Sequence, residues 1–474
     1  MNALQNTPLA PLNYSQSDCQ AGIIHVGIGA FHRAHQAVYI NQLLGHSDQK
    51  NWGIIGINLR SEDAHVSQKL DAQGNIYTLK TLSPENHSTY AQVGSILSTI
   101  DWSKDANAAA DAVNDENVHL ITMTVTEGGY YLSETGELET HLPIVADAMK
   151  GEGSCIYAYL RASLNKRRLG CNLPITLLCC DNLRDNGHYL KSGFEQFVKA
   201  CNDTDLLEWM ATNVTFPCCM VDRITPRPDP IHAEDVKQTF GVDDTLTVMS
   251  ESYIQWVVED NFAGPMPDLA RVGVELVKDV TPYEDAKIRI LNGGHTILAY
   301  FAALKGYQTY DQGLADEELN AMFSAYETGE VIPAIGQSPI NLQDYYGLTK
   351  TRFSNSNIAD AVARICADGG IKFPIFILPT ISNCYANGHV PSQGLKGIAA
   401  WYVFMCKVIA KEIDFQYVEP RWDYLETLVN GKDASKFVAC QDLWGQVPDE
   451  FPEFKQQLTE AINAMFERFP VGTA

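Results

Sequence analysis

The sequence predicts an α/β N-terminal domain built on a parallel sheet, followed by a mostly α-helical C-terminal domain. With 474 residues the chain is about three times as long as a typical single-core domain, so two domains are expected. The first half alternates short, uniformly apolar runs with segments of helical period, which is typical of strands buried on both faces. The second half contains longer segments of 3.6-residue period and few strand-like runs. We therefore expect domains at residues 1–275 and 276–474.

Individual elements follow from these patterns. Apolar runs bounded by Gly, Asn, Asp or Pro predict buried strands at residues 23–26, 52–57, 119–125 and 174–180. Helical periodicity predicts helices within residues 284–304, 317–326, 357–366 and 454–469. The longest apolar stretch, residues 397–410, contains Lys407 and is too short to span a bilayer, so it predicts a buried helix.

Charge and cysteine usage narrow the class of protein. The 58 acidic and 34 basic residues leave a net charge of −24, which repels phosphate backbones and anionic membrane surfaces. We expect a small-molecule substrate, no nucleic-acid or membrane partner, and a monomer or weak homo-oligomer. The 12 cysteines form no Cys-x-x-Cys pair, and the N-terminal segment lacks a cationic and an apolar region. These features predict a cytoplasmic protein.

A glycine-rich turn follows the first predicted strand. Residues 27–35 read GIGAFHRAH and lead into a helical segment. Gly27 permits a tight turn, and Gly29 lets the backbone approach a dinucleotide pyrophosphate. The other candidate cofactor contacts in this turn are Phe31, His32 and Arg33. An ordinary strand-to-helix turn that binds no cofactor is the alternative interpretation.

His32 occupies the position of the usual third glycine. His32 and His35 are three residues apart, a spacing that suits a metal. Arg33 lies between them and no carboxylate cluster is near, so we expect both histidines to pack beside the cofactor and predict no metal.

The acidic residue that binds the ribose usually lies about 20 residues beyond the glycines. Glu62 and Asp63 stand after the second predicted strand, where a carboxylate could accept a hydrogen bond from the 2′-hydroxyl of NAD. Arg60 could instead bind the 2′-phosphate of NADP, and solvated loop charges are a third interpretation. We predict NAD.

Residues 281–295 carry an amine, an amide and an imidazole at helical spacing. At 100° per residue, Asn292 lies 140° from Lys287 with His295 between them, so the three side chains share one side of an α-helix. Removing a hydroxyl proton while the carbon loses hydride needs a base and donors to the developing alkoxide. Lys287 could be that base, and Asn292 and His295 could hold the oxygen. A surface lysine, a capping asparagine and a core-edge histidine are the alternative.

Residues 281–295 allow two further interpretations. Tyr283 and Lys287 match the Tyr-x-x-x-Lys pair of short-chain dehydrogenases, but those chains are about half this length. Glu284 precedes Lys287 by three residues, so it could relay the released proton to solvent. A solvated ion pair is the alternative.

Six motifs occur in order from about residue 22, namely GIGAFHRAHQAVYI, TVTEGGYYL, CDNLRDNG, MVDRITPRP, QWVVEDNF and YEDAKIRILNGGH. Together they resemble the polyol-specific long-chain dehydrogenase family, also called the mannitol dehydrogenase family, and the match extends beyond residue 373. The resemblance implies a Rossmann-type N-terminal domain, a helical C-terminal domain and no metal. The chain departs from the family's pattern at Gly293-Gly294, because Gly-Ser or Ala-Ser is commoner in the family before the histidine.

The resemblance also implies roles for individual residues. Lys287 would be the general base, with Asn292 and Asn182 as oxyanion donors. The further residues that it suggests are Asp222, Arg364 and Lys372 for the substrate and Glu127 near the cofactor and proton path.

The expected reaction is the NAD-dependent oxidation of a secondary alcohol of an acyclic polyol to a ketose. The amino-acid sequences of these motifs are most similar to those of family members that convert D-arabinitol to D-xylulose. D-Mannitol with D-fructose is the alternative, and reduction of fructuronate is less favoured because the chain is strongly acidic. A nucleotide-sensing binding protein without catalysis would keep the glycine turn and leave Lys287 without a catalytic role.

Overall fold

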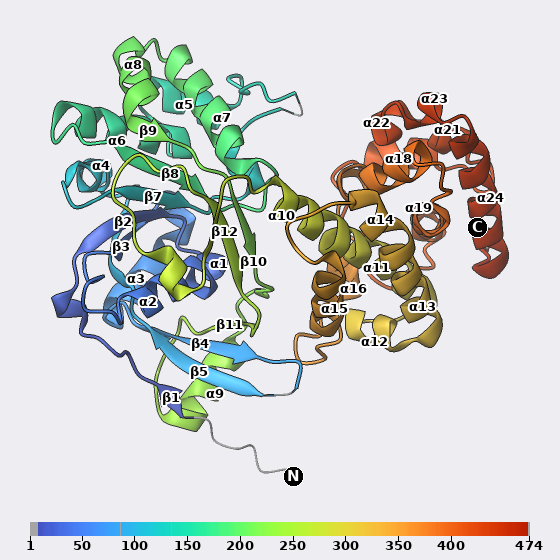
Figure 1. The fold of residues 1–474 in the computed structure, drawn as a ribbon, viewed down its shortest axis with the longest axis horizontal. Coiled ribbons are helices and arrows are strands. Elements are labelled where there is room, and N and C mark those ends of the chain that lie inside the picture. The colour runs from blue at the N-terminus through green and yellow to red at the C-terminus, as the bar shows by residue number, and fades with distance from the viewer. Residues whose placement is uncertain (1–7, 86, 134, 473–474) are drawn as a thin grey trace. The chain divides into compact units, whose positions relative to one another are not determined.

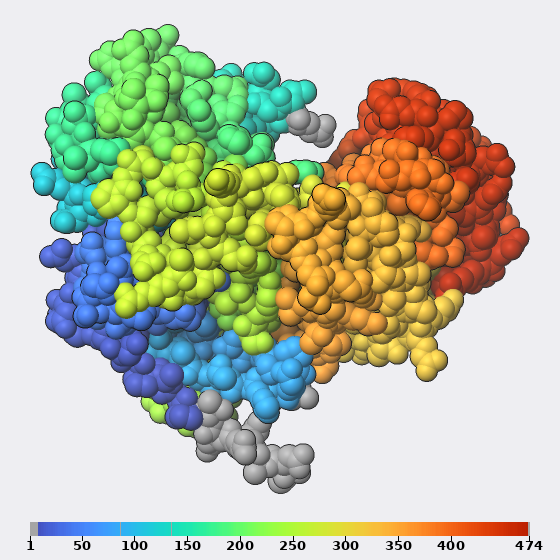
Figure 2. Space-filling view, viewed as in Figure 1, coloured from blue at the N-terminus to red at the C-terminus, as the bar shows by residue number. Residues whose placement is uncertain are grey.

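The computed structural model describes residues 8–85, 87–133 and 135–472, and the chain divides into two compact units, Met1–Thr281 and Pro282–Ala474 (Figures 1 and 2). The first seven residues of the N-terminal segment considered above lie outside the described residues. Contacts within the chain thus divide it after Thr281, whereas the sequence places the boundary after residue 275.

The first unit is built on a six-stranded parallel sheet in the order β6-β3-β2-β7-β8-β9. Its strands are β2 (Ala21–Val26), β3 (Gly53–Asn58), β6 (Ile96–Asp101), β7 (Leu120–Met123), β8 (Ile175–Cys179) and β9 (Val214–Thr215). The four predicted buried strands are confirmed as β2, β3, β7 and β8. Successive strands extend to one side of β2 and then, from β7 onward, to the other. Open sheets of this kind bind ligands at the carboxyl ends of the strands where the order reverses.

Helices cover this sheet. α3 packs against β3 and β6, α4 packs against β6, and α7 packs against β8 (Figure 1). The helices of the first unit are α1 (Ala30–Ala34), α2 (Gln36–Leu43), α3 (Ala64–Ala72), α4 (Ala106–Asp111), α5 (Pro143–Lys150), α6 (Ile156–Leu169), α7 (Asn186–Ala200), α8 (Thr204–Asn213) and α9 (Pro230–Phe240). Short 3-10 turns are η1 (Gln16–Asp18), η2 (Ser61–Asp63), η3 (Ala112–Asn114), η4 (Glu127–Tyr130) and η5 (Leu269–Val272).

Two smaller sheets complete the first unit, and the sequence analysis did not predict them. One has the order β1-β5-β4-β11 and is formed by β1 (Leu9–Ala10), β4 (Tyr77–Leu82), β5 (Ser88–Val93) and β11 (Val248–Glu251). The other has the order β10-β12-β13 and is formed by β10 (Cys219–Asp222), β12 (Gln255–Glu259) and β13 (Glu275–Val277). β4 pairs with β5 in antiparallel orientation, and β10 pairs with β12 in the same way.

The second unit is mostly helical, as predicted. Its α-helices are α10 (Thr281–Ala286), α11 (Gly294–Lys305), α12 (Tyr310–Ala315), α13 (Glu317–Tyr326), α14 (Ile332–Ile335), α15 (Leu342–Phe353), α16 (Val362–Ile365), α17 (Gly369–Lys372), α18 (Leu378–Ala386), α19 (Ser392–Ile409), α20 (Trp422–Leu428), α21 (Ser435–Val438), α22 (Gln441–Trp444), α23 (Val447–Glu450) and α24 (Glu453–Arg468). α19 is the predicted buried helix and packs between α11 and α24. Of the helices in the described ranges, none has the length and apolar character needed to cross a bilayer.

Two helix predictions need correction. Residues 357–366 form turns and only the single helical turn α16, because the Asn355 side chain accepts from the backbone N–H of Asn357 and Ala359 adopts a positive φ of 46°. Within residues 284–304, the segment Lys287–Gly293 is a π-helix, η6, rather than an α-helix. Two more π-helices, η7 (Glu327–Val331) and η8 (Phe373–Ile377), pack against it.

Candidate active site

The two glycines of the first turn are required for different reasons. Gly27 has φ +95°, and a Cβ there would overlap the backbone carbonyl of Thr124, so the fold itself demands glycine. Gly29 precedes α1 in an extended conformation, and a Cβ there would meet nothing within 4 Å. The protein's own packing therefore does not explain a glycine at position 29, whereas close approach by a bound ligand would explain it.

A pocket of about 310 Å³ opens beside this turn. Its walls come from the carboxyl ends of β2, β3 and β7, where the strand order reverses. The lining residues include Gly27, Ile28, Gly29, Asn58, Arg60, Asp63, Thr124, Thr126, Gly128 and Tyr131. This is the position at which open α/β sheets hold a dinucleotide.

A strained loop forms one wall of this pocket. Thr126 has φ 68° and ψ 160°, a region that is rarely open to residues other than glycine and that costs on the order of 1–3 kcal/mol. The buried Asp181 carboxylate holds the loop by accepting from the backbone N–H groups of Thr126 at 2.8 Å and Val125 at 3.0 Å, and from the Tyr130 hydroxyl at 2.6 Å. Burial raises the pKa of Asp181, and these hydrogen bonds oppose the rise. Glu127 follows Thr126 directly and is exposed.

The predicted cofactor residues at the end of β3 take different positions. Arg60 and Asp63 both line the pocket, and a guanidinium nitrogen of Arg60 lies 2.7 Å from an Asp63 carboxylate oxygen. Glu62 is exposed and is not part of the pocket lining. Asp63 is therefore the carboxylate that faces the space a ribose would enter.

The remaining residues of the turn pack into the first unit. The fully buried imidazole of His32 stacks on His25 of β2 with the ring centroids 3.3 Å apart. Burial lowers the pKa of His25 to about 3, so this ring is neutral. Arg33 is also buried and donates to the carbonyl of Leu246 at 2.5 Å. Phe31 is half-buried.

Two further predicted residues stand at strand ends in the first unit. Asn182 is exposed and follows Asp181, just beyond the carboxyl end of β8. Asp222 is the last residue of β10; it is buried and pairs with Gln255 across the sheet.

Lys287 and Asn292 both lie on the π-helix η6 of the second unit. A π-helix is hydrogen-bonded from residue i to i+5, so two side chains five residues apart are nearly one turn apart on the same face. A regular α-helix would separate them by about 140°. The π-helical winding therefore brings the amine and the amide closer in direction than the sequence analysis assumed. Lys287 and Glu284 are both buried.

His295 lies in the first turn of α11 within an aromatic and charged cluster. Its ring stacks on Phe353 at 4.7 Å and meets Tyr310 edge-on at 4.4 Å, and its Nε2 lies 3.8 Å from a carboxylate oxygen of Asp360. Burial lowers the pKa of His295 to about 3, and Asp360 opposes that shift. The imidazole is therefore neutral at ordinary pH and can act only as a neutral donor or acceptor.

Asp360 links His295 to Arg364. Its carboxylate accepts from the Arg364 Nε at 2.6 Å and also pairs with an Nη of the same guanidinium. The Lys372 amine donates to the carbonyl of Ile365 at 2.9 Å, and burial lowers its pKa. The structure thus brings together three of the predicted residues, and it adds Asp360, which the sequence analysis missed. The four-residue spacing of Asp360 and Arg364 was its only signal.

A second buried carboxyl lies behind the π-helix. Glu327 is fully buried, and neither carboxyl oxygen has a hydrogen-bond partner among the residues that the structure describes. A Cβ at Gly294 would overlap Glu327 Oε1. Gly294 thus leaves room for this carboxyl group.

We expect Glu327→Gln to change how stability depends on pH. Burial raises the pKa of Glu327 well above its usual range, although Arg289 opposes the rise. The folded form therefore binds a proton that the unfolded chain has lost, so the stability from this group is complete below the unfolded pKa and falls as pH rises through the folded pKa. The variant should raise Tm by roughly 2–4 °C at pH 9 and change it little at pH 5, measured by calorimetry. Glu450→Gln, at an exposed position, is the control and should show no such pH dependence. A Tm difference that is the same at both pH values would contradict the prediction.

The fold and the site of the first unit define a dinucleotide-binding protein: an open parallel sheet, a glycine turn after β2 and a pocket where the strand order reverses. Comparison with known proteins gives the family. The model of the mannitol dehydrogenase Rossmann domain matches residues 21–271, and that of the mannitol dehydrogenase C-terminal domain matches residues 279–466. The chain therefore belongs to the mannitol dehydrogenase family of polyol dehydrogenases.

Individual relatives agree with this assignment. The chain is 39% identical to a D-arabinitol 4-dehydrogenase of Klebsiella pneumoniae over 83% of this chain and 86% of that protein. It is 36% identical to a mannitol 2-dehydrogenase of Cereibacter sphaeroides over 92% of both chains. The solved structure of Pseudomonas fluorescens mannitol 2-dehydrogenase in ternary complex with NAD and D-mannitol superposes with a TM-score of 0.85 at 32% identity, covering 97% of this chain and 94% of that one.

Proposed function

We propose that the chain is an NAD-dependent polyol dehydrogenase that oxidises D-arabinitol to D-xylulose, with Lys287 as the general base. The observation that carries this proposal is the π-helix η6, whose i to i+5 winding puts positions 287 and 292 nearly one turn apart. The 39% identity to the Klebsiella pneumoniae D-arabinitol 4-dehydrogenase supports the choice of substrate.

The residues of the first pocket fit NAD. Gly27 makes the turn, the open space at Gly29 admits a pyrophosphate, and Asp63 can accept from the ribose 2′-hydroxyl. Asp63 already pairs with Arg60, so it neutralises the cation that a 2′-phosphate would need. Bound NAD would accept hydrogen from the carbon that carries the reacting hydroxyl. Glu127 stands beside this pocket and is assigned to the proton path.

The chain's own residues would handle the proton and the oxygen. Lys287, in its neutral form, accepts the hydroxyl proton. Asn292 and Asn182 donate to the oxygen as negative charge develops on it. His295 is neutral, so it can hold the same oxygen or orient the lysine without adding charge. Glu284, three residues before Lys287, passes the proton toward solvent.

Substrate hydroxyls are assigned to Asp222, Arg364 and Lys372. Asp360 holds the Arg364 guanidinium through two contacts, so the arginine head is already oriented before substrate arrives. A cytoplasmic location and a monomeric or weakly associated state also belong to this proposal. Free thiols at all 12 cysteines support a reducing compartment.

Mannitol 2-dehydrogenase activity is the second candidate. It is supported by the 36% identity to the Cereibacter sphaeroides enzyme and by the likeness to the Pseudomonas fluorescens complex with NAD and D-mannitol. The two activities differ in substrate chain length and hydroxyl configuration.

Initial rates with D-arabinitol, D-mannitol, xylitol and ribitol, each with NAD and with NADP, test the proposal. We expect the highest kcat/KM for D-arabinitol with NAD, by about 10-fold or more over the other pairs, because a hydroxyl with no partner in the site costs about 1–3 kcal/mol. The product with D-arabinitol should be D-xylulose. A higher kcat/KM for D-mannitol would move the assignment to the second candidate, and no turnover of any polyol would reject both.

A further inference from the structure

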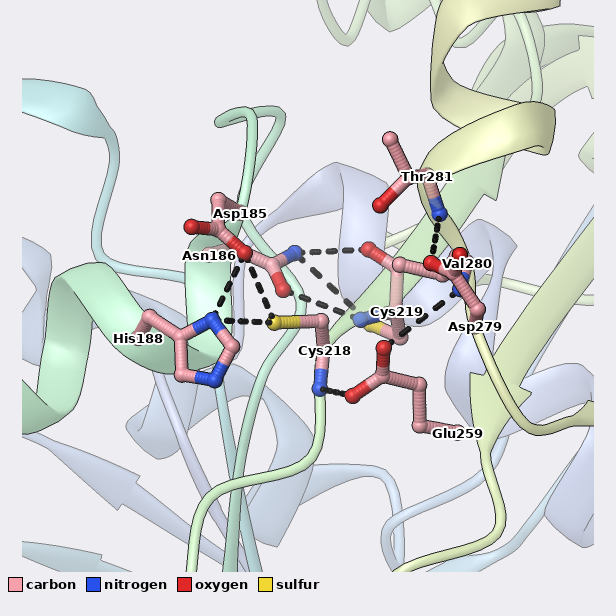
Figure 3. Close-up of polar contacts among 9 residues, drawn as sticks. All are labelled: Asp185, Asn186, His188, Cys218, Cys219, Glu259, Asp279, Val280 and Thr281. Carbon is pink, nitrogen blue, oxygen red and sulfur yellow. Dashed lines mark hydrogen bonds and ion pairs between the residues drawn. The ribbon is translucent and has the colours of Figure 1, made fainter.

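Three metal-ligating side chains meet in the first unit, apart from the pocket at the glycine turn (Figure 3). Their ligand atoms all lie within 4.8 Å of one another. His188 Nδ1 is 2.7 Å from Asp185 Oδ1, and Cys218 Sγ is 3.4 Å from the same oxygen and 3.7 Å from the same nitrogen. Asp185 and His188 stand at the start of α7, and Cys218 immediately precedes β10.

The backbone around these residues is held rigidly. The Asn186 amide donates to the carbonyl of Cys219 at 2.7 Å and accepts from its N–H at 2.9 Å, which fastens the start of α7 to the start of β10 (Figure 3). The Cys218 N–H donates to a carboxylate oxygen of Glu259 at 3.0 Å. A Cβ at Gly187 would come within 2.6 Å of the carbonyl oxygens of Phe216 and Pro217, so only glycine permits this close approach. The donors are therefore positioned by the fold and not by chance surface contact.

The geometry does not suit a nucleophilic triad. In a Cys-His-Asp triad the thiol and the carboxylate address opposite nitrogens of the imidazole. Here Cys218 and Asp185 both face Nδ1 of His188. Three different ligand atoms that lie this close together suit the chelation of a metal ion instead.

The distances fit a tetrahedral ion. For metal–ligand distances of about 2.0–2.3 Å, neighbouring ligands of a tetrahedron are about 3.3–3.8 Å apart. The two distances from Cys218 Sγ, 3.4 and 3.7 Å, already have these values. The 2.7 Å contact between Asp185 and His188 must open by about 0.6 Å, which two exposed side chains at the helix start can do.

We propose that Asp185, His188 and Cys218 bind one Zn²⁺ ion, with water as the fourth ligand. A site made of thiolate, imidazole and carboxylate donors favours Zn²⁺ over Ca²⁺ or Mg²⁺. On binding, the Cys218 thiol proton leaves to solvent and the imidazole keeps its proton on Nε2. The ion ties the start of α7 to the start of β10. It takes no part in the reaction, so this site is compatible with metal-free catalysis.

Binding is tested on the full-length, tag-free protein after exhaustive chelation. One equivalent of Co²⁺ should give a thiolate-to-cobalt charge-transfer band in the near ultraviolet, and Zn²⁺ should displace it with a stoichiometry of one. Cys218→Ser should abolish the band. His188→Gln and Asp185→Asn should each weaken Zn²⁺ binding at least about 10-fold in calorimetric titration. Both side chains are exposed, and asparagine tolerates the positive φ of 57° at position 185, so these variants should fold.

Matched controls separate this site from general binding of zinc to thiols and imidazoles. Cys171→Ser and His141→Gln, elsewhere in the first unit, should bind Zn²⁺ as the wild type does. Zn²⁺ should also raise Tm of the wild type by several degrees and leave kcat of the chelated enzyme unchanged. Absence of the charge-transfer band in the wild type, or equal Zn²⁺ affinity in the wild type and His188→Gln, would overturn the proposal. A kcat that depends on Zn²⁺ would overturn its non-catalytic role.

Discussion

Replacing Lys287 by methionine is expected to lower both polyol oxidation and ketose reduction by about 10²–10⁴-fold. Methionine keeps the length and packing of the buried side chain but cannot accept a proton. The proposal assigns proton removal to this amine alone, so no other group should replace it at a comparable rate. Initial rates in both directions, with NADH binding followed by fluorescence titration, measure the effect. Cofactor affinity and Tm should stay close to wild-type values.

Two experiments separate catalysis from structural damage. Lys305→Met changes the last residue of α11, where the amine pairs with Asp316 and Glu318, and it should retain wild-type rates with at most about 1 kcal/mol loss of stability. Lys287→Ala should recover part of its activity when a small primary amine is added, and recovery should increase with pH as the free base becomes available. If Lys287→Met keeps near wild-type turnover while it binds NADH, a different group is the base and the assignment of Lys287 is wrong.

The strands of the first unit could be predicted from the sequence where both of their faces are buried. β2, β3, β7 and β8 are covered on both faces, so their side chains are apolar without alternation and the runs are visible in the chain. The hairpin of β4 and β5 was missed because strands with partly exposed faces mix polar and apolar residues over only six positions each.

The candidate site could be predicted from the sequence only in part. The glycine turn and the motif from Lys287 to His295 are local in the sequence, so their spacing could be read directly. The π-helical winding could not, because it depends on packing of η6 against η7 and η8. Asp360 was missed for a similar reason: it meets His295 through tertiary structure, across 65 positions of the chain.

The pair Gly27 and Gly29 offers the second large effect, since alanine at each position should fail in a different way. At Gly27 the added Cβ overlaps the carbonyl of Thr124 and the backbone has φ +95°, so Gly27→Ala should destabilise the first unit by at least about 3 kcal/mol. At Gly29 the Cβ meets nothing, so Gly29→Ala should keep Tm within about 2 °C of the wild type.

The same Cβ at position 29 would stand where the proposed pyrophosphate approaches the backbone. Gly29→Ala should therefore weaken NAD binding by about 10-fold or more, which corresponds to about 1.4 kcal/mol. Calorimetric unfolding and NADH titration on both variants, with Gly74→Ala at a turn outside the pocket as the control for a positive φ without a clash, separate the two effects. Normal NAD affinity in Gly29→Ala would mean that the dinucleotide does not approach this turn, because the open space at position 29 would then serve neither the fold nor the ligand.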